Sequence, residues 1–198
     1  MVLAFHNYES TFEHRPPAAI RDSEGRPLLS WRVAILPYVE EDNLYREFYL
    51  DEPWDSPHNI RLLDKMPHVY GSPGEQPPQS NMTFYRVFLG PGTPFERDGM
   101  SSKRELLFPT SERILIIDAG EAVPWTKPDE LEYRPDAPLP PLGGILRSNS
   151  WLDRQRDKKD LIQAAMMDGS VRRFERNFDE AELRALIVRD GKKPAPRE

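Results

Sequence analysis

Proline constrains this chain more than any other feature of its sequence. There are 21 prolines among 198 residues, which is about twice the usual share. They cluster at Pro16-Pro17, at Pro77-Pro78 and between Pro135 and Pro141. Because proline fixes φ and lacks a backbone N–H, long uninterrupted helices and strands cannot run through these clusters. The sequence therefore predicts short elements joined by long loops with restricted backbones.

The composition is typical of one folded domain. Hydrophobic residues make up 38% of the chain and aromatic residues 10%, which is enough for one core. Acidic and basic residues are mixed along the sequence, and the net charge is −6. Because there is no basic stripe, we expect no nucleic-acid partner. The sequence contains no cysteine, which excludes disulfides and thiolate metal sites, and we expect no cofactor.

The first part of the chain has helical spacing. In residues 2–12, Phe5, Tyr8 and Phe12 recur on one face, which we expect to be buried. The pair Pro16-Pro17 then ends the helix.

Two further helices are predicted before residue 70. Ser30 is a suitable N-cap for a helix over residues 31–36. A Ser-Pro pair favours the start of a helix over residues 57–65, with Ile60 and Leu63 facing the core.

The second part changes to the period of two that is typical of strands. Residues 83–89 and 113–118 predict two strands, and residues 179–188 predict a last helix. Because helices come first and an antiparallel sheet follows, the predicted class is α+β. We expect an N-terminal helix packed on an antiparallel sheet, with helical and proline-rich loop insertions.

The pair Asp168-Gly169 is the clearest structural motif. It separates two apolar runs, residues 161–167 and 170–175, and this pattern predicts a β-hairpin. A type I′ turn would give Gly169 a positive φ.

Motifs of the common enzyme classes are missing from the sequence: there is no Walker A loop, nucleophile elbow or H-E-x-x-H. His6, Glu9 and Glu13 share one face if residues 2–13 are helical, and such a set could hold zinc. The hydrated face of an amphipathic helix explains the same pattern, and we prefer that interpretation.

Two groups of carboxylates are further candidates. Asp51, Glu52 and Asp55 offer the hard oxygen ligands that suit calcium, although their spacing is not that of an EF-hand. Asp118 and Glu121 come at the end of a predicted buried strand, where catalytic groups often lie. No partner base or nucleophile accompanies them, so a structural role is favoured.

Tryptophans could line a pocket for a sugar-like ligand. We single out Trp54 and Trp125 as ligand-binding candidates, while Trp31 and Trp151 are less favoured. Tryptophans also anchor cores and loops, and the sequence leaves both interpretations open.

A series of blocks resembles one known family. The blocks are Asn7-Tyr8, Pro16–Ile20, Leu29–Tyr38, Asp42–Tyr45, Asp51–Asn59, Ser72–Gly74, Gly90–Thr93, Ala122–Pro128, Leu142–Gly144 and Asp168–Arg172. In this order they resemble the planctomycete-type family of unknown function whose members usually carry a prepilin-type N-terminal segment. That family also carries a solute-binding-protein label. The resemblance covers about residues 4–175.

The resemblance implies a pilin-like or pseudopilin-like architecture. Residues 1–198 would form a single head domain, with residues 1–12 as the end of a long anchoring helix and residues 178–198 as a C-terminal helix and tail. The anchor itself would lie upstream of Val2. Lys158 stands where the family's C-terminal signature has a histidine, so any role of that histidine does not carry over.

Three hypotheses follow. The favoured one is a non-enzymatic, extracytoplasmic head domain at the cell surface, with protein partners at the cell envelope. In this hypothesis the full-length protein is bound to the membrane only through the N-terminal helix, and the isolated chain is a soluble monomer. The alternative is an extracytoplasmic binding module for a small solute or a glycan. An enzyme is the least favoured, because no nucleophile–base pair can be named.

Overall fold

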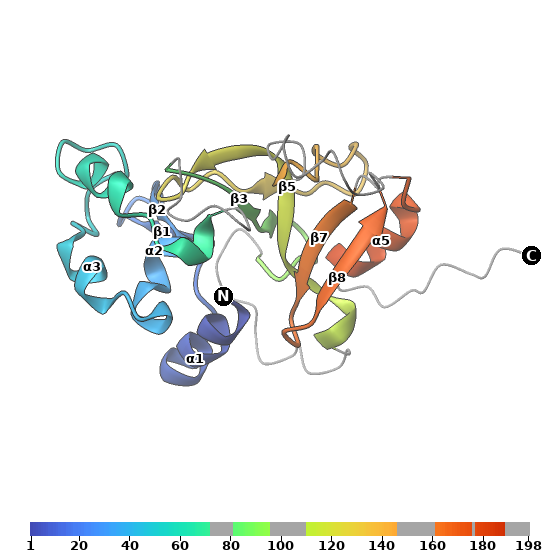
Figure 1. The fold of residues 1–198 in the computed structure, drawn as a ribbon, viewed down its shortest axis with the longest axis horizontal. Helices are drawn as coiled ribbons and strands as arrows, with labels where there is room; N and C mark the ends of the chain where they lie inside the picture. The colour runs from blue at the N-terminus through green and yellow to red at the C-terminus, as the bar shows by residue number, and fades with distance from the viewer. Residues whose placement is uncertain (72–80, 96–109, 146–160, 176, 189–198) are drawn as a thin grey trace, which may run out of the picture. The chain divides into compact units, whose positions relative to one another are not determined.

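The computed structural model describes residues 1–71, 81–95, 110–145, 161–175 and 177–188 (Figure 1). Its helices and 3-10 helices are α1 (Val2–Phe12), α2 (Trp31–Ala34), η1 (Leu36–Val39), α3 (Asp42–Glu47), η2 (Asn59–Lys65), η3 (His68–Tyr70), η5 (Thr110–Glu112) and α5 (Glu180–Ile187). Its strands are β1 (Ala19–Arg21), β2 (Pro27–Ser30), β3 (Met82–Arg86), β4 (Phe88–Leu89), β5 (Ile114–Pro124), β6 (Leu131–Glu132), β7 (Leu161–Met166) and β8 (Val171–Glu175).

The predicted α+β class is confirmed. The main sheet has the strand order β3-β5-β7-β8, and the β5–β7 and β7–β8 pairs are antiparallel. Two small sheets accompany it: an antiparallel pair of β1 and β2, and a parallel pair of β4 and β6. Among the described residues no element exceeds 11 residues, as the proline clusters predict. No helix in the described ranges has the length and apolar character needed to cross a membrane.

The chain divides into two compact units. The first comprises Leu3–Tyr85 and Ala122–Glu130, and the second comprises Arg86–Glu121 and Leu131–Glu198. The chain therefore leaves the first unit, builds much of the second and returns through Ala122–Glu130. The prediction of one domain over residues 1–198 stays a prediction.

In the first unit, α1 is the predicted N-terminal helix. The ring of Phe5 packs against that of Trp31 at a centroid distance of 5.1 Å, and Phe5 is buried. The expectation that Phe12 is buried as well is wrong, because its side chain is 50% exposed. Phe12 is the last residue of the helix, and the helix ends there with Glu13 in the left-handed conformation. That α1 packs on the main sheet stays a prediction.

The second helix begins as predicted, and the third does not. Ser30 N-caps α2, since its side chain accepts a hydrogen bond from the backbone N–H of Arg32. The α-helix predicted over residues 57–65 is instead the 3-10 helix η2. With three residues per turn, Asn59 and Leu62 face inward. The prediction of an inward-facing Ile60 is therefore wrong, and this residue is 44% exposed.

The strand predicted over residues 83–89 is two strands. β3 belongs to the main sheet, whereas β4 pairs with β6 in a separate parallel sheet. Val87, which lies between them, is fully buried, and its carbonyl accepts a hydrogen bond from the N–H of Leu131 at 3.0 Å. The backbone at Val87 thus passes from one sheet to the other.

The second unit contains the predicted hairpin of β7 and β8. Gly169 has the expected positive φ of 89°, but the type I′ turn is wrong. A type I′ turn needs positive φ at both central residues, and Asp168 is not among the non-glycine residues with positive φ. The N–H of Met166 bonds to the carbonyl of Ser170, and the N–H of Gly169 bonds to that of Met166. This pattern is a three-residue connection with glycine in its last position.

The predicted last helix is α5. Asp179 caps its N-terminus, accepting a hydrogen bond from the N–H of Ala181 at 2.9 Å. The helix contributes Leu183 and Ile187 to the aliphatic core of the second unit.

Candidate functional site

Arg32 in α2 forms a network of hydrogen bonds inside the first unit. It is fully buried. One terminal guanidinium nitrogen, Nη1, donates to Ser30 Oγ at 2.5 Å and to Glu130 Oε1 at 3.0 Å. The Nε nitrogen donates to the carbonyl of Tyr85 at 3.0 Å, and Nη2 donates to the same carbonyl. Its guanidinium carbon also lies 4.7 Å from the ring centroid of Trp31.

Glu130 neutralises this arginine. Its side chain is only 3% exposed, and the pair forms a buried salt bridge. Burying two charges is favourable only with good geometry and further hydrogen bonds, and here Ser30 and Tyr85 supply them. All of these groups belong to the first unit. The arrangement holds the end of β3, the start of α2 and residue 130 together, and it leaves Arg32 unavailable to an external anion.

Asn59, at the start of η2, organises the loop that precedes it. Its amide nitrogen donates to the carbonyls of Tyr49, Glu52 and Pro53 at 2.9, 3.1 and 3.1 Å. Its amide oxygen accepts from the N–H of Tyr49 at 3.0 Å, and its own N–H donates to Ser56 Oγ at 3.1 Å. A fully buried amide thus fixes residues 49–53 from the inside.

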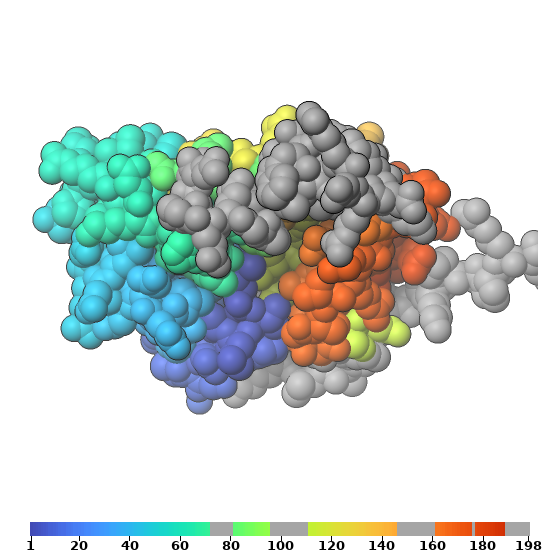
Figure 2. Space-filling model, viewed as in Figure 1, coloured from blue at the N-terminus to red at the C-terminus, as the bar shows by residue number. Residues whose placement is uncertain are grey.

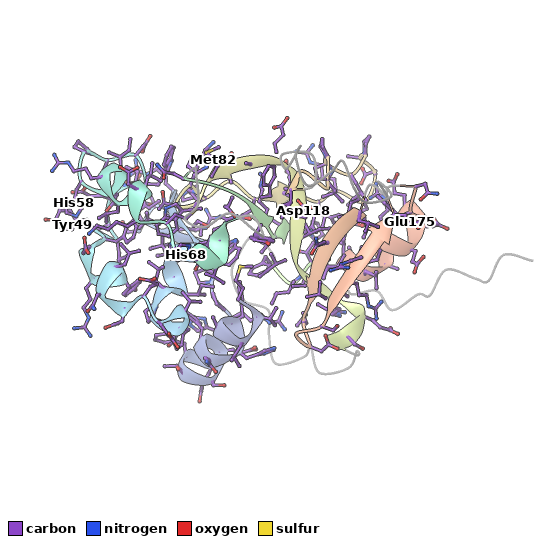
Figure 3. The ribbon with its side chains drawn as sticks, in the orientation of Figure 1. Tyr49, His58, His68, Met82, Asp118 and Glu175 are labelled. Atoms are coloured by element: carbon purple, nitrogen blue, oxygen red, sulfur yellow. The ribbon has the colours of Figure 1, made fainter. Side chains whose placement is uncertain are left out.

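The outer side of this loop carries an aromatic pair. The rings of Tyr49 and His58 are stacked, with a centroid distance of 3.6 Å and an interplanar angle of 7° (Figure 3). His58 Nε2 lies 2.7 Å from the carbonyl of Glu47, so the ring is fixed in place. Tyr49 is 50% exposed. Trp54 is half-buried, and its backbone N–H donates to the carbonyl of Leu28 at 2.9 Å.

The acidic residues proposed as calcium ligands lie on the same loop. Asp51 and Asp55 are exposed, whereas Glu52 is half-buried. Within the described ranges, no group of three or more His, Asp or Glu side chains is placed to hold a metal ion. The structure therefore does not bring these three carboxylates together.

The metal candidates on α1 do not converge either. Glu9 lies 3.8 Å from Arg15 in a salt bridge. Glu13 is the C-cap of the helix with φ of 60°, so it no longer follows the helical face of His6 and Glu9. Both His6 and Glu13 are exposed. This arrangement agrees with the hydrated helix face that we preferred.

Trp125 is a core residue and not a surface residue. It is fully buried, and its indole N–H donates to the carbonyl of Leu63 at 3.0 Å. Its ring stacks on Tyr70 at 5.7 Å and meets Phe48 edge-on at 5.8 Å. These contacts occupy the indole and weigh against the prediction that Trp125 binds a ligand. Within the described ranges, Trp54 is the tryptophan that stays partly accessible. Trp151 and Lys158 lie outside the described residues.

Asp118 in the second unit is a titratable group in an unusual environment (Figure 3). It lies in β5 and is fully buried. Its Oδ1 accepts from the N–H of Ile145 at 3.1 Å, and Oδ2 has no partner within the described part of the chain. Burial raises the pKa of Asp118 to about 6, although backbone hydrogen bonds from Ile145 and Gly144 act against this. Glu121, three residues further along, is exposed and does not join it.

Sequence reasoning missed three residues that organise the molecule: Arg32, Asn59 and Glu130. One signal was available for Arg32, because it is the single charge within the apolar run from Leu28 to Leu36. A charge in such a run is expected to be buried and paired. Nothing local marks Glu130 as its partner.

Comparison with known proteins gives one match. The family model described as "Protein of unknown function (DUF1559)", named SBP_bac_10, matches residues 1–125 of the chain. No curated protein and no solved structure matches. The matched region includes Arg32, Asn59 and Trp125 and ends before Glu130.

Proposed function

Since the chain belongs to the DUF1559 family of proteins of unknown function, we propose that it is a non-enzymatic head domain that acts outside the cytoplasm. Its role is structural or is the binding of other proteins at the cell envelope, as in pilin-like proteins. This proposal rests on one observation: polar side chains of the first unit form their hydrogen bonds within the unit and do not point them at a ligand site. Arg32, Asn59 and Trp125 direct their polar groups to neighbouring backbone and side chains.

This internal use weighs against an active site built on those residues. A catalytic centre needs nucleophiles, bases or electrophiles that reach a bound substrate. The Arg32 guanidinium is instead occupied by Ser30, Tyr85 and Glu130. Such a network favours a rigid framework, and a rigid framework suits a domain whose task is to present a surface.

In this proposal α1 is the end of a longer anchoring helix. The contact of Phe5 with Trp31 would connect that helix firmly to the head. Mechanical connection of this kind is what a surface-anchored head requires. The localisation and the anchor are parts of the proposal that an experiment in cells has to test.

The test is protease accessibility of the head in intact cells. The natural reading frame, including whatever precedes Val2, is expressed with an epitope tag after residue 198. We expect a protease added outside to remove the tag while a cytoplasmic marker protein stays intact. Protection of the tag in intact cells and also in spheroplasts, followed by its loss after lysis, would place the head in the cytoplasm and reject the proposal.

A second candidate function, the binding of a small solute or a glycan, has one observation in its favour. The stacked pair of Tyr49 and His58 offers an exposed aromatic surface, and Trp54 lies on the same loop. Aromatic faces of this kind pack against sugar rings. Calorimetry with a panel of oligosaccharides tests it: binding that Tyr49→Ala abolishes, and that Phe12→Ala leaves unchanged, would favour this function.

A further inference from the structure

The first unit carries a second aromatic surface, formed by α1, the residues that follow it, η1 and α3. We call it the α1–α3 face and define it by Tyr8, Phe12, His14, Tyr38 and Tyr45. The ring centroid of Tyr8 lies 4.5 Å from that of Phe12, 5.8 Å from that of His14 and 5.7 Å from that of Tyr38. The rings of Phe12 and His14 are stacked at 6.0 Å. These contacts make one continuous group of rings.

Tyr45 of α3 belongs to the same group. The pKa of Tyr8 is raised by burial and by the neighbouring phenols of Tyr45 and Tyr38. The pKa of Tyr45 is likewise raised by burial and by Tyr38. The rings of Tyr8 and Tyr38 are in contact, and the phenol of Tyr45 lies near enough to both for an electrostatic interaction. In Figure 2 the deep blue of α1 adjoins the lighter blue of the segment that carries η1 and α3.

This face is not a closed core. Phe12 is 50% exposed, His14 is exposed, and the three tyrosines are half-buried. Tyrosine is enriched in the central parts of protein interfaces because it supplies a large contact area with few rotatable bonds. A group of rings that is partly accessible and already ordered is suited to bind a partner.

The segments that carry these rings are rich in carboxylates. Within residues 8–15 and 38–46 there are five acidic side chains and two arginines. The acidic residues are Glu9, Glu13, Glu40, Glu41 and Asp42. Both arginines are already paired, Arg15 with Glu9 and Arg46 with Asp42. The face therefore combines aromatic rings with an excess of negative charge.

We propose that the α1–α3 face binds a basic protein segment, rich in arginine or lysine, of an envelope partner. The inference rests on the proposed interaction role and names the chemistry of its partner. An arginine or lysine placed over the exposed ring of Phe12 gains a cation–π contact. Its charge is at the same time attracted by Glu13, Glu40 and Glu41, and such charge complementarity speeds association and selects the partner.

A second copy of this chain fits the face less well. In a symmetric dimer the same face would meet itself. The excess of carboxylates would then face an equal excess, and like charges across an interface disfavour association. A basic segment meets the same carboxylates with attraction.

The experiment measures the binding of a fluorescein-labelled hexa-arginine peptide to the full 198-residue chain by fluorescence anisotropy. A hexa-glutamate peptide of the same length serves as the charge control. The matched variants are Phe12→Ala and Tyr49→Ala, because both rings are 50% exposed and both are stacked on a histidine. Tyr49 also lies beside acidic residues, so weaker binding by Tyr49→Ala would reveal non-specific attraction of the peptide to an acidic chain.

We expect hexa-arginine to bind and hexa-glutamate not to bind. Phe12→Ala should weaken binding by about fivefold to tenfold, the size of one lost cation–π contact. The double variant Glu40→Gln/Glu41→Gln should weaken it by a similar factor and reduce its salt dependence. Tyr49→Ala should leave the affinity unchanged, and circular dichroism should show that every variant is folded.

Three results would overturn the inference. The first is no binding of hexa-arginine up to millimolar concentration. The second is an equal loss for Phe12→Ala and Tyr49→Ala, which would indicate non-specific attraction. The third is a dimer in analytical ultracentrifugation that Phe12→Ala dissociates, which would identify a second copy as the occupant. None of these results bears on protease accessibility in cells, so this inference and the head-domain proposal can fail separately.

Discussion

Each of the two units of this chain buries an ionisable side chain in its core, Arg32 in the first and Asp118 in the second, and the two side chains have different surroundings. In the first unit the guanidinium of Arg32 has an opposite charge and several hydrogen-bond acceptors. In the second unit the carboxyl of Asp118 has only backbone N–H donors on one oxygen, and its Oδ2 has no partner in the described chain. A buried charge with a partner acts as a structural link, whereas a buried acid without one responds to pH.

The surroundings of these groups differ in the same way. Rings dominate the core of the first unit: the ring of Tyr70 contacts those of Trp31 and Trp125. The side chains of Tyr70 and Trp125 also donate hydrogen bonds to backbone carbonyls. The core of the second unit is mainly aliphatic, as in Ile117 and Ile162. The core of the first unit thus depends on hydrogen bonds and ring contacts with defined directions. The core of the second unit depends mainly on burying aliphatic side chains of its strands. Each of the following predictions tests this contrast.

The largest effect is expected from Glu130→Ala. It would leave the buried guanidinium of Arg32 without its counter-charge, and breaking a buried pair from one side destabilises a protein by about 3–5 kcal/mol. Urea unfolding measures this loss. Asp42→Ala is the control, because it removes one half of the exposed Asp42–Arg46 pair, which should cost less than about 1 kcal/mol. A similar loss in the two variants would show that the buried pair has no special role.

A smaller loss is expected from Asn59→Ala. The change removes the side chain that bonds to the backbone of Tyr49, Glu52 and Pro53, and unsatisfied buried groups cost about 1–3 kcal/mol. We therefore expect a loss of about 3 kcal/mol in urea unfolding, together with faster proteolysis within residues 49–55. Asn43→Ala, at an exposed position of α3, is the control and should change stability by less than about 0.5 kcal/mol. An unchanged cleavage rate would mean that Asn59 does not hold the loop.

Asp118→Asn in the second unit is expected to raise the free energy of unfolding, whereas the two variants above lower it. Because the pKa of Asp118 is raised to about 6 in the folded chain, the folded state holds its proton more tightly than the unfolded state. Stability from this group is therefore highest below about pH 4 and falls as the pH rises through 6. The amide cannot ionise, so the variant should be more stable than the natural chain by about 1–2 kcal/mol at pH 7.5. The gain is smaller than the full shift implies, since the new amide N–H meets no acceptor.

Thermal unfolding at a series of pH values from 4 to 8 measures this difference. The advantage of Asp118→Asn over the natural chain should grow as the pH rises from about 4 to about 6 and stay constant above that. Glu121→Gln, an exposed carboxylate on the same strand, is the control and should follow the natural chain at every pH. A constant difference between Asp118→Asn and the natural chain would mean that Asp118 does not titrate in this range.

The elements that the sequence predicted are those with local signals. Ser30 and Asp179 cap their helices through the backbone N–H groups of residues two positions further on, and such signals can be recognised in a short stretch of sequence. The Asp168-Gly169 pair between two apolar runs likewise predicted β7 and β8. The predictions for Phe12 and Ile60 were wrong because helical spacing shows which residues share a face. It does not show how much of that face the rest of the fold buries.

The candidate site was less predictable, because its key contacts are long-range. Arg32 and Glu130 are separated by 98 positions, and no local pattern connects them. Trp125 could be a ligand platform or a core residue on sequence grounds, and only its position beside Tyr70 decides between the two. The unpartnered oxygen of Asp118 is equally invisible to sequence, since it depends on which groups the fold places around β5.

The smallest effect concerns a feature that the two units share. The hairpin of β1 and β2 and the hairpin of β7 and β8 have the same hydrogen-bond pattern at their turns. Asp22 bonds through its N–H to the carbonyl of Arg26, as Met166 does to Ser170, and Gly25 and Gly169 each donate to the residue three positions earlier. These glycines have φ of 79° and 89°, and a Cβ added to either one would meet no atom within 4 Å.

Backbone strain is thus the only penalty for Gly25→Ala and Gly169→Ala, and it costs about 1 kcal/mol in each. Urea unfolding should give equal losses within about 0.5 kcal/mol. A much larger loss for Gly169→Ala would mean that the turn in the aliphatic unit also fixes the register of its strands, and the contrast between the units would then extend to their turns.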